Sequence, residues 1–219
     1  INIFLKGKKV DSITEDHCKQ LGQQLALLHT NTLNFKLSRK NSLSQKHWIN
    51  LFENFRNTKN TEYQELFQKI NLEIIFLEKY WPKNLPSGII HGDLFQDNVF
   101  FNNNVLSGII DFYFACNDFF AYELAICINA WCFNSKNEFN IKKLASILQG
   151  YQIHRKLLEI EKKSFPILLR GAAIRFLLTR LNDLIYKQEG AFVELKDPIE
   201  YFNILNLHQN NNSLSKLDF

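Results

Sequence analysis

Apolar residues recur every three or four positions along most of the chain, and this period predicts amphipathic helices. The first predicted helix follows Thr14, a typical N-cap residue, and ends at His29. Acidic residues occupy its first turn, where the positive end of the helix dipole stabilises negative charge. The other helices predicted from helical periods or from continuous apolar sequence span residues 43–55, 61–81, 122–133, 141–151, 165–186 and 197–207.

The pattern changes between Gly88 and Asp111, where short apolar runs are separated by glycine and asparagine. Asparagines at 102–104 lie between two of these runs, and asparagine tolerates the positive φ of hairpin turns. We therefore expect a loop followed by a two-stranded ribbon. A short strand or extended segment is predicted at residues 2–5. The predicted fold class is α+β, with one mostly helical domain around a small β-hairpin.

The same region carries polar side chains at a spacing suited to phosphoryl transfer. Asp93 lies in a loop, Asn98 follows five residues later, and Asp111 ends the next strand. Because Asn98 and Asp111 lie at the two ends of a hairpin, strand pairing can bring their side chains to one end of the ribbon. A carboxylate and an amide oxygen suit Mg²⁺ on nucleotide phosphates. Asp93 would then accept the proton of an attacking hydroxyl.

The order H-x-D-x-x-x-x-N followed by I-D-F, which begins at His91, resembles the catalytic loop and metal strand of the aminoglycoside/choline kinase-like phosphotransferases. The resemblance implies that Asp93 is the catalytic base and that His91 orders the loop. It also implies that Asn98 and Asp111 bind Mg²⁺ and, through it, ATP.

Longer segments are similar to the bacterial homoserine kinases of this superfamily, so the resemblance covers nearly the whole chain. They span residues 91–101, 110–118, 124–132 and 170–181. Gln96 departs from that family, which usually has proline there, and this loosens the loop without removing a ligand. The resemblance implies transfer of the γ-phosphoryl group of MgATP to the side-chain hydroxyl of L-homoserine, in threonine biosynthesis.

An amino-acid substrate needs a cation or a helix N-terminus for its carboxylate and an acid for its ammonium. Arg170, Arg175 and Arg180 lie on a helix that is otherwise apolar, and buried arginine is usually paired. We choose Arg175 as the substrate-binding arginine, with Asp118 and Glu123 as weaker polar candidates. The alternative for these arginines is an internal salt bridge with Asp183, Glu123 or Asp118.

Other readings of the chain stay open. One is a related kinase that acts on another hydroxyl compound, such as choline, a sugar or an aminoglycoside. A choline pocket would need an aromatic or acidic cage, whereas the arginine-bearing helix suits a carboxylate. A non-catalytic kinase-like binding module is another, and retention of Asp93, Asn98 and Asp111 argues against it.

A kinase of this class also needs an N-terminal lobe over the nucleotide. The sequence has no glycine-rich loop or lysine-bearing strand ahead of residue 14, and it starts at Ile1 without any methionine. We therefore expect a piece of a longer protein, with the N-terminal lobe largely absent and residues 1–13 as its hinge and remnant. Residues 14–219 would form a helical, protein-kinase-like C-terminal lobe, with the catalytic loop at 91–98 and the metal strand at 105–111. This piece alone is expected to be inactive.

Composition sets further limits. A net charge of +4 with only short basic runs does not indicate a nucleic-acid partner. The four cysteines show no C-x-x-C spacing, which predicts reduced thiols, and no apolar run approaches the ~18 residues that span a bilayer. We expect a small-molecule substrate, a cytoplasmic location and no membrane partner, while the oligomeric state is left open. Histidines other than His91, including His29, are expected in surface or cap roles.

Overall fold

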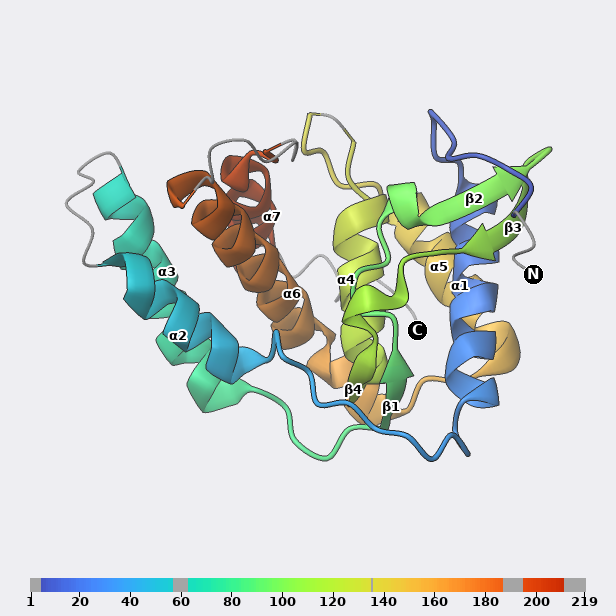
Figure 1. Cartoon of the computed structure of the whole chain (residues 1–219), viewed down its shortest axis with the longest axis horizontal. Coiled ribbons are helices and arrows are strands. Elements are labelled where there is room, and N and C mark those ends of the chain that lie inside the picture. Colours follow the sequence, from blue (N-terminus) through green and yellow to red (C-terminus); the bar gives the residue numbers. More distant parts are fainter. Residues whose placement is uncertain (1–4, 57–62, 135, 187–194, 211–219) are drawn as a thin grey trace. The chain divides into compact units, whose positions relative to one another are not determined.

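The computed structural model describes residues 5–56, 63–134, 136–186 and 195–210 (Figure 1). Within these ranges the chain divides into two compact units. The first unit takes the residues up to Asn41 and from Asn84 to Phe165, and the second takes Ser42 to Lys83 and the residues from Pro166 onward. The boundary predicted at residue 14 stays a prediction. The predicted strand at residues 2–5 lies, except for Leu5, outside the described residues.

Helices dominate the described residues, as the apolar periods predict (Figure 1). They are α1 (Glu15–Asn31), α2 (Gln45–Arg56), α3 (Gln64–Tyr80), α4 (Phe120–Trp131), α5 (Ile141–His154), α6 (Glu159–Ile185) and α7 (Pro198–Asn210). None of them is long and apolar enough to cross a membrane. All four cysteines are buried and free of disulfides.

Local sequence explains where α1 and α7 begin. The predicted N-cap is confirmed, because the Thr14 hydroxyl accepts a hydrogen bond from the His17 amide at 3.2 Å. His17 returns the interaction by accepting from the Thr14 amide with its Nδ1. Asp197 caps α7 by accepting from the Ile199 amide at 2.9 Å, with Pro198 in the first helical position.

Helix α6 begins earlier than the predicted helix at 165–186. Its first turns, from Glu159, are built from a charged run that shows no apolar face, so the sequence period cannot reveal them. Pro166 lies inside this helix and removes one backbone donor. The division of the chain between the two units falls within the same helix, between Phe165 and Pro166.

Two small antiparallel sheets lie in the first unit. The predicted ribbon is β2 (Val99–Asn102) with β3 (Val105–Ile109), and its turn uses positive φ at Asn103 and Asn104. A second pair, β1 (Ser87–Ile90) with β4 (Cys116–Phe119), is not evident from the sequence. Its polar strand is held from both sides, because the Asn117 amide also donates to the Arg39 carbonyl oxygen at 2.7 Å.

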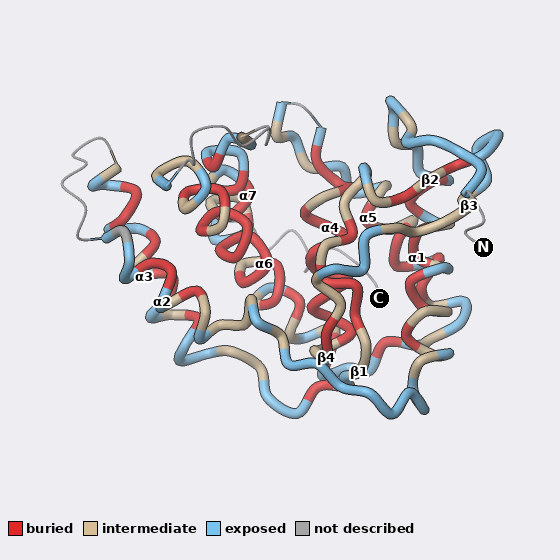
Figure 2. Tube along the Cα trace, viewed as in Figure 1, coloured by how far each residue is buried: buried red, intermediate tan, exposed pale blue. Residues whose placement is uncertain are grey.

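Helix α4 forms the centre of the first unit. Of its twelve residues only Ala130 escapes burial, which agrees with its nearly continuous apolar sequence (Figure 2). It contacts β1, β4 and α5. A helix in this position can present polar side chains to the loop that follows β1 without exposing them to water.

Helices α1 and α5 pack with their backbones in close contact, and glycine makes this possible. A Cβ added to Gly22 would overlap the carbonyl oxygen of Ile147, and one added to Gly150 would overlap that of Lys19. The obstructing atoms are backbone atoms, so they cannot move aside as a flexible side chain could. The position of α5 against α1 therefore depends on both glycines.

The second unit is built from α2, α3, α7 and the part of α6 after Phe165. Trp48 and Trp81 pack edge to face with ring centroids 5.2 Å apart, and both rings approach Gly171. The absence of a side chain at Gly171 thus leaves space on this helix for the aromatic rings. Arg170 of α6 forms a two-pronged ion pair with the buried Glu73 of α3.

Replacing Gly22 or Gly150 with alanine is expected to lower the free energy of unfolding by about 1–3 kcal/mol, the usual penalty of overpacking. The intrinsic helix propensity of alanine, worth about 1 kcal/mol over glycine, acts in the opposite direction. Urea unfolding followed by circular dichroism measures the difference. Gln24→Ala, at an exposed position of the same helix, is the matched control. A Gly22→Ala protein as stable as this control would contradict the close packing.

Candidate active site

The loop predicted to be catalytic connects β1 to β2, and a buried carboxylate holds its beginning. The Glu123 side chain, on α4, is fully buried. Its Oε2 accepts from the His91 amide and its Oε1 from the Gly92 amide, each at 2.7 Å. Gly92 has φ +79°, and a Cβ there would come within 3.0 Å of the Phe114 carbonyl oxygen. This turn therefore favours glycine on both conformational and steric grounds.

His91 links the loop to the end of β3. Its Nε2 lies 2.8 Å from the Ile110 carbonyl oxygen, which can only accept, so Nε2 carries the proton. Nδ1 then accepts from the Asp93 amide at 3.3 Å. The side chain is fully buried, and its ring packs against Phe112 at 4.6 Å. His91 thus joins the two segments that carry the predicted site.

Asn98 is oriented by its amide group. Its side-chain Nδ2 donates to the backbone carbonyl oxygen of Asp93 at 2.8 Å. The backbone carbonyl oxygen of Asn98 accepts from the Ile110 amide at 3.0 Å. Because the nitrogen is used inside the loop, Oδ1 is the atom left for a ligand. It has no hydrogen-bond partner among the residues that the structure describes.

Asp111 follows β3 in a left-handed conformation, with φ 61° and ψ 60°. A non-glycine residue in this region is strained, and such residues concentrate at functional sites. The pairing of Val99 with Ile109, continued by the bond from Ile110 to Asn98, brings the backbones of Asn98 and Asp111 to one end of the ribbon. The exposed Asp111 carboxylate has no partner in the described part of the chain.

These two oxygen donors determine what the site can hold. Within the described ranges no group of three or more His, Cys, Asp or Glu side chains is arranged for a metal. An amide oxygen and a carboxylate fit a hard divalent cation that keeps water and phosphate oxygens in its other positions, as Mg²⁺ does. Nucleotide phosphates would be the natural source of those oxygens.

Asp93 lies between these elements and is half-buried. Its amide donates to His91, and its carbonyl oxygen accepts from Asn98 and, at 2.9 Å, from the Phe95 amide. The backbone on both sides of its side chain is therefore fixed. Its role as a base stays a prediction, for which the rigid backbone is a physical requirement.

Helix α4 also holds the later part of the loop. The Trp131 indole, fully buried, donates to the Leu94 carbonyl oxygen at 2.9 Å. The Gln96 amide donates to the Ala130 carbonyl oxygen at 3.0 Å. Gln96 therefore provides a tether at the position where the resemblance leads one to expect proline.

The two weaker substrate candidates are engaged inside the first unit. Asp118 accepts from the Asn41 amide group at 2.6 Å and from the Phe119 amide at 2.7 Å. Glu123 uses both carboxylate oxygens on the loop. Their proposed contacts with substrate stay predictions, and what the structure shows for both is a part in holding backbone.

The three arginines of α6 lie in the second unit. Arg170 pairs with Glu73, and Arg180 pairs with Glu200 at 2.6 Å, so both form internal salt bridges, but with acids other than the expected ones. Arg175 is 2% exposed, and its guanidinium lies 4.4 Å from the Phe176 ring. Burial and, after it, the positive charge of Arg175 lower the pKa of His47 on α2.

His29 was expected in a surface or cap role, and this is wrong. It is fully buried on α1, and its Nε2 lies 3.2 Å from Glu123 Oε2. Its Nδ1 lies 2.7 Å from the Tyr151 hydroxyl. The available signal was its spacing of four from Leu25, which places it on the apolar face of the helix.

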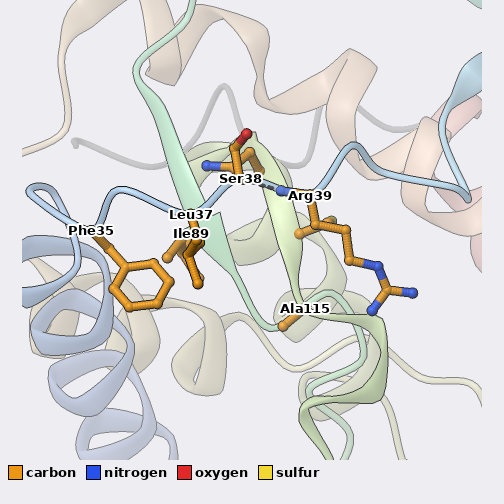
Figure 3. A pocket seen from close by; sticks show the side chains of 8 residues that line it. Phe35, Leu37, Ser38, Arg39, Ile89 and Ala115 are labelled. Atoms are coloured by element: carbon orange, nitrogen blue, oxygen red, sulfur yellow. Dashed lines mark hydrogen bonds between the residues drawn. The ribbon is translucent and has the colours of Figure 1, made fainter.

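A cavity of about 190 Å³ opens beside β1 and β4 in the first unit. The segment that follows α1 supplies Phe35, Leu37 and Arg39 to its wall (Figure 3). Phe35, Leu37 and Ile89 lie on one side, while Arg39 and Ala115 lie on the other (Figure 3). It adjoins the segment after Asp111 and is mostly apolar.

Comparison with known proteins agrees with this geometry. Residues 3–157 match the family described as phosphotransferase enzyme family. Homoserine kinase of Bartonella tribocorum is 49% identical over 216 residues, which are 99% of this chain and 68% of that protein. Homoserine kinase of Parvibaculum lavamentivorans is 50% identical over 206 residues, 94% of this chain and 64% of that protein. The chain thus spans about two thirds of the length of these curated relatives.

Solved structures share the fold at low identity. An amicoumacin kinase, determined with AMP-PNP, Ca²⁺ and its ligand, superposes with a TM-score of 0.70 at 13% identity, over 98% of this chain and 65% of that one. Plasmodium vivax ethanolamine kinase gives 0.67 at 15% identity, over 97% and 64%. The family match and the curated relatives together show that this chain belongs to the phosphotransferase enzyme family, as a kinase-like transferase related to the homoserine kinases.

Proposed function

We propose that the protein phosphorylates the side-chain hydroxyl of L-homoserine with MgATP, in threonine biosynthesis. The observation that carries the proposal is the pair of available oxygens at one end of the ribbon, Asn98 Oδ1 and the Asp111 carboxylate. The names of the curated relatives support the substrate. The AMP-PNP and Ca²⁺ in the amicoumacin kinase structure support a nucleotide with a divalent cation.

Each loop residue has a role in this reaction. Asn98 and Asp111 would hold Mg²⁺, which neutralises the phosphate charge that builds up during transfer. Asp93 would orient the substrate hydroxyl and accept its proton. His91 and Glu123 hold the backbone on which Asp93 is carried. Such positioning matters because phosphoryl transfer depends on alignment more than on covalent chemistry.

The intact gene product is the form to test, in a coupled assay of ADP release. A panel of L-homoserine, choline, ethanolamine, an aminoglycoside and a sugar separates the proposed substrate from the related hydroxyl compounds. Turnover with L-homoserine above the others supports the proposal. Nucleotide binding without turnover on any of them would favour a non-catalytic binding module instead.

Asp93→Asn is expected to lower kcat for L-homoserine about 10²–10⁴-fold, the usual contribution of a positioned acid–base group. Binding of MgADP, measured by calorimetry, should change little, because the metal ligands remain. Asp97→Asn, an exposed position in the same loop, is the matched control and should keep most of its activity. An Asp93→Asn enzyme with unchanged kcat would exclude Asp93 as the base.

Arg175→Lys is expected to raise KM for L-homoserine about tenfold or more, because lysine cannot form the planar, two-pronged contact of a guanidinium with a carboxylate. KM for ATP should stay the same. Arg180→Lys on the same helix, at a residue that is paired with Glu200, is the control for general effects of the substitution. Equal KM values for homoserine in the wild type and Arg175→Lys would remove Arg175 from the substrate site.

A further inference from the structure

A chain of polar side chains leads from Glu123 on α4 to Glu161 in the first turn of α6. His29 Nε2 lies 3.2 Å from Glu123 Oε2, and His29 Nδ1 lies 2.7 Å from the Tyr151 hydroxyl. Arg155 donates to that hydroxyl through Nη1 at 3.2 Å. Its Nη2 pairs with Glu161 at 2.9 Å. The links join residues of α1, α4, α5 and α6 with the connector after α5.

Donors and acceptors in this chain have one consistent direction. The ionised Glu123 carboxylate only accepts, so His29 must carry its proton on Nε2. Nδ1 is then bare and accepts the hydroxyl proton of Tyr151. The Tyr151 oxygen in turn accepts from the Arg155 guanidinium, which Glu161 holds. Every link thus fixes the orientation of the next.

The chain depends on a neutral His29. Burial lowers the pKa of this histidine. The hydrogen bond and charge of Glu123 oppose that shift, the charge of Arg155 adds to it, and the charge of Glu161 opposes it more weakly. The titratable and charged groups that face it are Glu123 from α4, Tyr151 from α5, Arg155 from the connector and Glu161 from α6. A protonated His29 would carry a hydrogen on Nδ1, so the Tyr151 hydroxyl could no longer donate to it, and the direction of the hydrogen bonds along the chain would be lost.

Four members of this chain are shielded from bulk water. His29, Tyr151, Glu123 and Glu161 are all 0% exposed. Phe120 covers the His29 ring with centroids 4.4 Å apart, and the Arg155 guanidinium lies 4.8 Å from the Phe120 ring. Removing one donor therefore leaves a buried acceptor unpaired, which changes the orientation or the proton position that its neighbour favours.

We propose that Tyr151, Arg155 and Glu161 are positioning residues for the catalytic loop. They keep His29 in its Nε2–H form, His29 orients the Glu123 carboxylate, and Glu123 holds the His91 and Gly92 amides. The effect on the loop is a property of the fold. Its effect on turnover rests on the proposed kinase function.

Tyr151→Phe tests the chain by removing one hydroxyl without opening a cavity. The two ring nitrogens of His29 should no longer show the NMR chemical shifts of a ring protonated only at Nε2, because Nδ1 has lost the hydroxyl that it accepts from. Because the neutral form loses the hydrogen bond to Nδ1, the pKa of His29 should rise from its lowered value toward that of free histidine. Amide hydrogen exchange at His91 and Gly92 should become at least about tenfold faster, which corresponds to about 1.4 kcal/mol.

Tyr201→Phe is the matched control, since Tyr201 is equally buried and lies in the second unit. It should leave the His29 signals and the exchange of the loop amides unchanged. Glu161→Gln is a second test variant, because it weakens the hold on Arg155 and should speed exchange of the His91 and Gly92 amides by a smaller factor. The Glu161 charge raises the pKa of His29 and its loss acts to lower that pKa, so the direction of the pKa change separates this variant from Tyr151→Phe. Wild-type His29 shifts and loop exchange in Tyr151→Phe would overturn the proposal.

In the intact gene product, Tyr151→Phe should lower kcat for L-homoserine with little change in KM. The acid limb of its pH profile should move to higher pH, following the raised pKa of His29. The NMR and exchange effects could appear in a protein that phosphorylates no homoserine. This result would contradict the proposed function and would still support the positioning chain. An active enzyme whose kcat, profile and exchange all match the wild type would sink the chain alone.

Discussion

Two successive backbone amides, those of His91 and Gly92, meet a single carboxylate that has no access to water. An ionised side chain in such a place is costly unless donors surround it, and its loss would leave those donors buried and unpaired. Glu123 satisfies the condition with the two amides and His29. The loop conformation therefore depends on the Glu123 carboxylate, and the carboxylate depends on the loop amides for its hydrogen bonds.

From this contact the arrangement of the remaining site follows in steps. With its first residues held, the loop directs His91 to the end of β3 and the Asp93 carbonyl oxygen to Asn98. The ribbon then brings Asp111 beside Asn98 through ordinary strand pairing. Backbone hydrogen bonds carry most of this order. The side chains of the predicted site are thus carried on backbone that Glu123, His91 and strand pairing hold in place.

Sequence reasoning recovered what local chemistry specifies. The asparagine turn and the apolar runs predicted the β2–β3 hairpin, and the spacing of Asn98 and Asp111 predicted that their backbones lie at one end of it. It failed where a residue takes its role from a distant partner. His29 is 94 residues from Glu123 in the chain. The polar segment β4 is extended because it pairs with β1 and donates a hydrogen bond to the Arg39 carbonyl oxygen. The first turns of α6 were not predicted, because a charged run has no apolar period.

The orientation of Asn98 has a consequence for the charge of the site. Its nitrogen must donate to the Asp93 carbonyl oxygen, and a carboxylate at that position would present an acceptor to an acceptor and repel it. Position 98 thus requires a neutral ligand, and Asp111 is left as the single anionic one of the pair. A divalent cation held by both would keep a net positive charge of about one unit. That surplus attracts phosphate, whereas a pair of carboxylates would cancel it.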